Sequence, residues 1–147
     1  MGIFDAMDIA GSALSAERLR MDVTAENLAN ANTTRGVDGG PYRRKVVVLQ
    51  QQQSTRDFGT ELASQMQRGV KGNGVEVAGV AEDATPNRRI YDPGHPDADG
   101  DGYVTMPNVD SVSEMVDLIS ASRAYEANVT AMQATKQMFS KTLDLLR

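Results

Sequence analysis

The chain has 147 residues and a formal charge of −5 at neutral pH, with no cysteine, no tryptophan and a single histidine. This length suits one domain. The missing cysteines and lone histidine exclude disulfide frameworks, thiol nucleophiles and metal centres built from several Cys or His ligands. Aromatic residues make up only 5% of the chain, so its core must rely on aliphatic side chains, as in helix packing. We expect no enzymatic activity and no cofactor.

The charge and hydropathy patterns also limit the partners. Nucleic-acid binding draws its affinity from clustered Lys and Arg, and the one three-residue basic run here is Arg43-Arg44-Lys45. No segment approaches the roughly 18–20 apolar residues needed to cross a bilayer, and the N-terminus lacks the pattern of a cleavable signal peptide. We therefore expect no nucleic-acid partner and no membrane insertion.

Residues 3–31 have helical spacing and no proline, which predicts a long N-terminal helix. Side chains recur every seven residues in two rows, Met7, Leu14, Met21 and Leu28 in one and Ile9, Ala16, Val23 and Asn30 in the other. At about 100° per residue the two rows lie about 200° apart. A helix with apolar rows on two sides needs neighbours on both sides. This pattern favours a multi-chain assembly, and the central helix of an ordinary bundle is the alternative.

Residues 36–109 contain all five prolines and most of the glycines, and are predicted to form a small β-rich module. Strands are expected in 42–49, 75–80 and 103–106, with a hairpin signal at Asn73-Gly74. The Gln-rich residues 50–72 are interpreted as a flexible surface excursion, in which Phe58, Leu62 and Met66 allow a short helix.

A second long helix is predicted over residues 110–147. Ser111 and Glu114 have the spacing of a capping box, in which each side chain bonds to a backbone N–H of the first turn. Apolar residues recur at every seventh position of this segment and predict a coiled-coil seam. They are Leu118, Tyr125, Met132, Phe139 and Leu146. The expected fold is mainly α, with a small β-rich middle module and a coiled-coil pair of terminal helices, divided as 1–35, 36–109 and 110–147.

Residues 97–102 imitate the start of an EF-hand calcium loop, with Asp97, Asp99 and Asp101 followed by Gly102. The match then fails, because loop position twelve is Asn108 and not a bidentate Glu. A calcium-binding loop protein is one alternative function, and a free-standing coiled-coil adaptor is another. His95 has no second histidine or cysteine as a partner, so we interpret it as a structural loop residue.

Several segments resemble the bacterial flagellar axial proteins, the subunits of rod, hook and hook-associated structures. An Asn-rich signature at residues 25–36 and a helix motif at 114–129 match the whole family. The segments 41–45, 88–99, 102–104 and 107–109 are similar to the C-type proximal rod subunits, most specifically in Tyr91-Asp92-Pro93-Gly94-His95-Pro96-Asp97.

This resemblance implies a structural subunit of the proximal rod of the flagellar basal body, which transmits torque and lines the export channel. It implies export through the flagellar type III pathway to a periplasmic position. The implied partners are further copies of the chain, the B-, F- and G-type rod subunits and the adaptor between rod and MS ring. The seven-residue rows would then form the subunit interfaces, and Asn27, Asn30 and Thr33 would satisfy backbone groups at the helix end, with a purely local capping role as the alternative.

Overall fold

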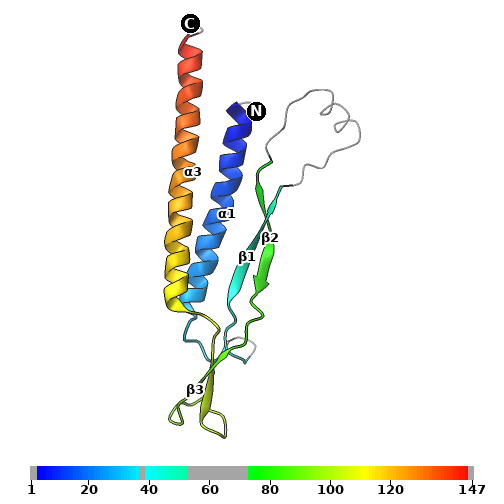
Figure 1. Ribbon diagram of the computed structural model, residues 1–147, viewed down its shortest axis with the longest axis vertical. Coiled ribbons are helices and arrows are strands. Elements are labelled where there is room, and N and C mark those ends of the chain that lie inside the picture. Colours follow the sequence, from blue (N-terminus) through cyan, green and yellow to red (C-terminus); the bar gives the residue numbers. More distant parts are fainter. Residues whose placement is uncertain (1–2, 37–38, 53–72, 146–147) are drawn as a thin grey trace, which may run out of the picture. The chain divides into compact units, whose positions relative to one another are not determined.

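The computed structural model describes residues 3–36, 39–52 and 73–145. Two long helices, α1 (Ile3–Ala29) and α3 (Ser111–Leu145), contain 27 and 35 residues and confirm the mainly α fold (Figure 1). Between them in sequence lie four strands: β1 (Lys45–Gln51), β2 (Val75–Glu82), β3 (Arg88–Tyr91) and β4 (Tyr103–Met106). The predicted short helix and Leu146 lie outside the described residues.

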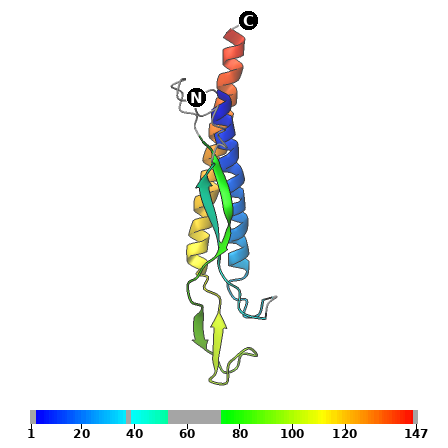
Figure 2. The ribbon, with the colours of Figure 1, turned by 90° about the vertical axis from the view of Figure 1, so that its right-hand side faces the viewer.

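The strands form two separate two-stranded sheets, β1 with β2 and β3 with β4 (Figure 2). The first pair is antiparallel, since the Gln52 N–H donates to the Gly74 carbonyl at 2.9 Å and the Asp83 N–H donates to the Arg44 carbonyl at 2.8 Å. The second pair is also antiparallel, with Arg88 opposite Met106 and Tyr91 opposite Tyr103. The predicted strands are therefore present.

Strand β3 was not expected from the sequence, because four residues that begin Arg88-Arg89 show no alternating pattern. Tertiary contacts explain it: the Tyr91 and Tyr103 rings meet edge to face at 5.2 Å, and Val104 on β4 is buried. Gly102 closes this hairpin with a φ of 77°, where a Cβ would come within 2.9 Å of the Tyr91 ring.

The start of α3 differs from the predicted capping box. Asp110 is the capping residue: its carboxylate accepts a hydrogen bond from the Val112 N–H at 3.2 Å and one from the Ser113 hydroxyl at 2.8 Å. These bonds hold the pKa of the Asp110 carboxyl below its usual value. The Glu114 side chain does not return to Ser111, because it bonds to groups distant in sequence instead.

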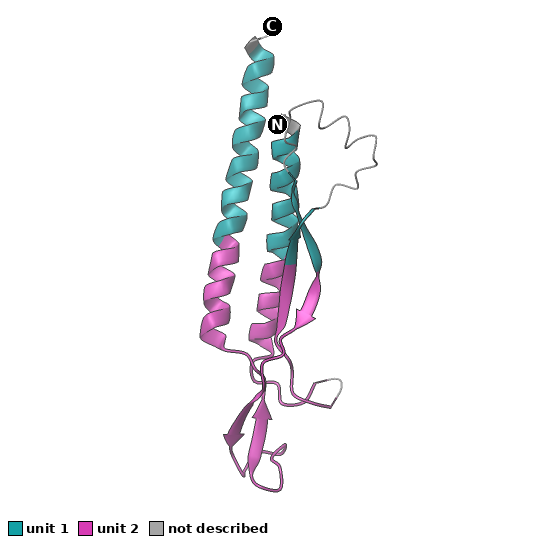
Figure 3. Ribbon diagram, turned by 45° about the vertical axis from the view of Figure 1, so that its right-hand side comes forward, with its two compact units in different colours: residues 1–18, 49–78, 123–147 teal, residues 19–48, 79–122 magenta. Residues whose placement is uncertain are grey.

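The chain divides into two compact units, and each draws on the N-terminal helix, the middle module and the C-terminal helix (Figure 3). The first unit comprises residues 1–18, 49–78 and 123–147, and the second comprises 19–48 and 79–122. In each unit a part of α1 packs against a part of α3.

In the first unit, small side chains bring the elements close together. A Cβ added to Gly11 on α1 would lie 3.9 Å from Cε of Met132 on α3. The Ser12 hydroxyl donates to the Ile9 carbonyl at 2.8 Å and accepts a hydrogen bond from the Val75 N–H at 3.1 Å, which ties β2 to α1. Gly74 is required beside this contact, because a Cβ there would collide with the Ser12 side chain.

Candidate assembly interface

A buried polar network lies at the helix ends of the second unit. Its centre is Asn27 of α1, which is 1% exposed. Its amide nitrogen donates to the Lys45 carbonyl at 2.8 Å and to a Glu114 carboxylate oxygen at 3.1 Å. Its amide oxygen accepts bonds from the Lys45 N–H at 2.9 Å and from the Tyr42 hydroxyl at 2.8 Å. One side chain thus joins α1, β1 and α3.

Glu114 is the second centre of this network and is also 1% exposed. Its other carboxylate oxygen lies 2.6 Å from Nε of Arg44. The same guanidinium reaches Asp83 at 3.5 Å and Asp117 at 3.4 Å. The hydrogen bond to Glu114 is the largest cause that raises the pKa of Arg44 above its ordinary value. Burying a carboxylate is costly unless it is paired, so this arginine is required by the fold.

Asn108 extends the network toward the β strands. Its amide oxygen accepts a bond from the Arg44 N–H at 2.8 Å, and its amide nitrogen donates to the Thr85 carbonyl at 3.1 Å. Asn108, which stands at position twelve of the calcium-like loop, therefore links the backbone at Arg44 to the backbone at Thr85.

The other helix-end residues make local bonds. Asn30 donates to the Glu26 carbonyl at 2.9 Å, and the Thr33 hydroxyl donates to the Asn30 amide oxygen at 3.2 Å. Of the three signature residues, Asn27 is the one whose side chain bonds to elements distant in sequence. Its spacing in the Asn-rich signature pointed to a helix end but gave no indication of Glu114, 87 residues away.

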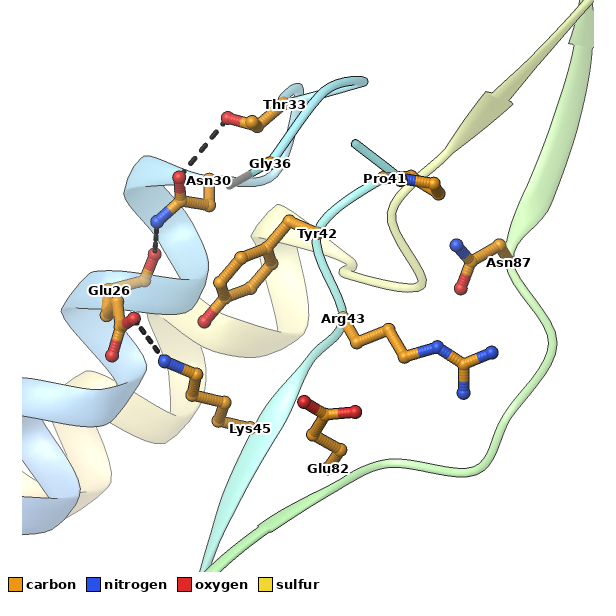
Figure 4. A pocket seen from close by; sticks show the side chains of 11 residues that line it. Glu26, Asn30, Thr33, Gly36, Pro41, Tyr42, Arg43, Lys45, Glu82 and Asn87 are labelled. Atoms are coloured by element: carbon orange, nitrogen blue, oxygen red, sulfur yellow. Dashed lines mark hydrogen bonds and ion pairs between the residues drawn. The ribbon is translucent and has the colours of Figure 1, made fainter. Parts of the chain in front are cut away.

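A groove of about 640 Å³ opens beside this network in the second unit (Figure 4). Its lining residues are Glu26, Asn30, Thr33, Gly36, Gly40, Pro41, Tyr42, Arg43, Lys45, Glu82 and Asn87. Lys45 and Glu26 form an ion pair at 2.5 Å across it, and desolvation together with nearby carboxylates raises the pKa of Tyr42 to about 12. The opposite charges in the lining balance one another, so the groove shows no preference for an ion of either sign.

The acidic loop after β3 is engaged by basic and hydroxyl groups. Asp97 accepts a bond from the Thr34 hydroxyl at 2.8 Å and lies 3.3 Å from Arg35, while Asp99 lies 3.2 Å from Arg89. His95 accepts a bond from the Asp97 N–H at 3.1 Å on Nδ1. Among the described residues no group of three His, Asp or Glu side chains is placed to hold a metal ion.

The seven-residue rows are partly covered by the chain itself. On α1, Val23 and Ala16 are buried, whereas the row Met7, Leu14, Met21 and Leu28, together with Ile9, is half-buried. On α3, Leu118, Tyr125 and Met132 are half-buried and Phe139 is exposed. Among the described side chains of α3, the buried ones are instead the polar or small residues Glu114, Ala121 and Thr135. Large apolar side chains are thus left at the margins of the helix contacts.

A further apolar surface lies on α3, outside the row of residues that the sequence predicted as the interface. Val112, Met115, Val116 and Ile119 are all exposed, by 64, 45, 61 and 54%. Their spacing could have identified a helical face, but not whether the rest of the chain covers it. In the described residues, no helix is long and apolar enough to span a membrane.

Comparison with known proteins gives consistent results along the chain. Residues 7–35 match the family model described as flagella basal body rod protein, and residues 101–145 match the model of the flagellar basal body rod FlgEFG protein C-terminal region. The chain is 50% identical to the flagellar basal-body rod protein FlgC of Bacillus subtilis, with 99% of each chain covered. It is 43% identical to FlgC of Borreliella burgdorferi and 46% identical to FlgC of Salmonella typhimurium, again over at least 98% of each chain.

Proposed function

Because the chain belongs to the FlgC family of flagellar basal-body rod proteins, and is thus a structural subunit of the proximal rod, we propose that its half-covered helix rows form the contacts between rod subunits. The observation that carries this proposal is the two-sided character of α1. Its Ala16 and Val23 face the interior of the chain, and Met7, Leu14, Met21 and Leu28 remain half-open at the margin. Half-open apolar rows on two long helices suit neighbours that each cover one side.

The family assembles with other rod subunits, and we propose specific partners for this chain. These are further copies of itself, the B-, F- and G-type rod subunits and the adaptor that joins the rod to the MS ring. Contacts in which one surface meets a different surface of the next subunit build helical tubes, as a rod requires. Neither nucleic acid nor a lipid bilayer is needed as a partner.

We further propose that the assembled chain lines the export channel and transmits torque from the motor in a periplasmic rod, after export through the flagellar type III pathway. The network of Asn27, Arg44 and Glu114 supports the torque role, because it links both helices to the β strands through charged and amide hydrogen bonds. Such a fully paired buried network resists deformation more than apolar contacts alone.

A motility experiment tests the interface rows. We expect Leu28→Asp or Met132→Asp to abolish swimming in the native host without abolishing expression, because a carboxylate at an apolar contact between subunits lacks a partner. Ser15→Asp and Gln133→Asp are matched controls at exposed positions of the same helices, and both are expected to swim. Helical circular dichroism of each purified variant separates loss of assembly from loss of folding. Normal swimming by both row variants would refute the proposal.

A further inference from the structure

The loop between β3 and β4 is tied to the residues that follow α1 by the carboxylate of Asp97. One carboxylate oxygen accepts a hydrogen bond from the Thr34 hydroxyl at 2.8 Å, and the other lies 3.3 Å from the Arg35 guanidinium. The Asp97 side chain is 24% exposed, so salt and water screen these contacts only in part. We call the contacts of Asp97 with Thr34 and Arg35 the latch. It joins segments of the second unit that are 63 residues apart in sequence.

The position of Asp97 depends on the one histidine of the chain. Nδ1 of His95 accepts a hydrogen bond from the Asp97 N–H at 3.1 Å. Backbone bonds complete the turn, because the His95 N–H donates to the Asp92 carbonyl at 3.2 Å and the Ala98 N–H donates to the His95 carbonyl at 3.1 Å. A ring nitrogen accepts a hydrogen bond only when it carries no proton, and the imidazolium carries a proton on both ring nitrogens. The observed turn therefore requires the neutral imidazole.

We propose that this arrangement is a pH-sensitive switch, in which protonation of His95 opens the latch. Protonated Nδ1 faces the Asp97 N–H as a second donor, so the ring must turn away and the half-buried N–H loses its partner. The backbone that holds the Asp97 carboxylate against Thr34 and Arg35 is then no longer fixed. The switch acts within one chain and does not rely on the proposed contacts between rod subunits.

The direction of the pH dependence follows from the number of bound protons. The closed latch contains the neutral ring, whereas the open loop admits both forms, so the open loop binds more protons. Closing is therefore favoured at high pH and is lost as the pH falls through the titration of the imidazole, ordinarily between about pH 8 and 5. Aspartates ordinarily titrate near about pH 4, so a change within this window is assigned to the ring.

The charged groups in this part of the unit leave room for the protonated ring. They are Asp92, Asp97, Asp99 and Asp101 in the loop, Arg89 on β3 and Arg35 after α1. Asp97 and Asp99 each pair with an arginine. The Asp92 carboxylate accepts a hydrogen bond from a backbone N–H of the loop at 3.2 Å. A protonated ring that turns outward, toward water or the exposed Asp101, breaks none of these pairs.

An NMR titration of the purified natural chain measures the switch, because the chain has one histidine. We expect the amide signals of the three latch residues to move between pH 8 and 5 with the same midpoint as the His95 ring protons. Protection of the Asp97 amide against hydrogen exchange, corrected for the intrinsic effect of pH, should fall about two- to tenfold, as expected for the loss of one neutral hydrogen bond.

Two matched pairs of variants separate the switch from a purely structural turn. His95→Asn keeps an acceptor for the N–H two residues further along and does not titrate, so its latch signals should stay unchanged in this range. Thr34→Val weakens the latch without a change of charge. By reciprocal linkage it should raise the proton affinity of the His95 ring by about twofold, whereas Thr34→Ser keeps the hydroxyl and should leave that affinity unchanged.

Three results would overturn the switch. A ring that titrates while the latch signals stay fixed would show that the protonated ring fits the closed latch. The same pH dependence in His95→Asn would assign the change to another group, and an unchanged proton affinity in Thr34→Val would show that ring and latch are uncoupled. Circular dichroism checks that each variant keeps its helices, and the titration of the natural chain decides the proposal without any variant.

Discussion

Replacement of Asn27 by alanine tests whether the buried network holds the second unit together. Asn27 makes four hydrogen bonds of 2.8 to 3.1 Å, to Tyr42, to Glu114 and two to the Lys45 backbone. Alanine removes all four and leaves the Lys45 N–H and a Glu114 carboxylate oxygen without this partner. The bond to Glu114 is the most consequential, because that carboxylate is 1% exposed and water reaches it poorly.

The expected loss follows from these bonds. Neutral hydrogen bonds contribute about 0.5–1.5 kcal/mol each, and a bond to a charged group contributes about 1.5–3 kcal/mol. With allowance for relaxation and for entry of water, we expect Asn27→Ala to lower the free energy of unfolding by about 3–5 kcal/mol. At a urea dependence of about 1–3 kcal/mol per molar, the unfolding midpoint would fall by about 2 M.

Urea denaturation of the purified chain, followed by circular dichroism, measures this loss. Asn30→Ala is the matched control, because the Asn30 side chain makes two local bonds, donating to the Glu26 carbonyl and accepting from the Thr33 hydroxyl. Loss of these two bonds is expected to lower the free energy of unfolding by about 1–2 kcal/mol. Equal, small losses for both variants would show that the four bonds of Asn27 contribute no more than a local cap, and would refute the reasoning.

Two further predictions concern the first unit and the start of α3. Gly74→Ala should lower the free energy of unfolding by about 1–3 kcal/mol in the same urea assay, because its Cβ would collide with the Ser12 side chain. Gly79→Ala is the control and should be near neutral, because a Cβ there would have no atom within 4 Å. Similar losses of stability for the two variants would argue against the close contact. Hydrogen bonds from Ser113 and Val112 keep the pKa of the Asp110 carboxyl in the folded chain below the ordinary value of 3.8. The contribution of this carboxylate to folding stability is therefore present above pH 3.8 and is lost as the pH falls through the folded-state pKa. The stability difference between the natural chain and Asp110→Ala should therefore shrink in strong acid, and a difference independent of pH would contradict this assignment.

The helices follow closely from local sequence properties. Helical periodicity and the absence of proline predicted a helix over 3–31, and α1 covers Ile3–Ala29. The spacing of Ser111 and Glu114 predicted a helix from about residue 110, and α3 covers Ser111–Leu145. Strand β3 was missed because its four residues depend on pairing with β4, and pairing is not a local property. The cap at the start of α3 was placed on Ser111 because Glu114 has the right spacing, but Arg44 and Asn27 bind that glutamate instead.

The candidate interface could be predicted only in part. Periodicity revealed apolar rows on both helices, but it cannot say which side of a helix the chain covers with its own residues. Burial in the folded chain selected Ala16, Val23 and Ala121 for internal packing and left Val112 and Val116 exposed. The resemblance to axial proteins indicated assembly. The exposed apolar side chains at the start of α3 could be identified only once the exposure of each residue was known.

The sequence by itself determined the two terminal helices, the β-rich middle and the family, because each depends on periodicity or on motifs read along a continuous stretch. Only the tertiary structure decided the hydrogen-bond partners of Asn27, Arg44 and Glu114, and which face of α3 remains exposed. The physical reason is distance along the chain: the bond between Asn27 and Glu114 spans 87 residues, and that between Arg44 and Glu114 spans 70. The partners of a buried polar group are fixed by the fold, since burial without them is too costly.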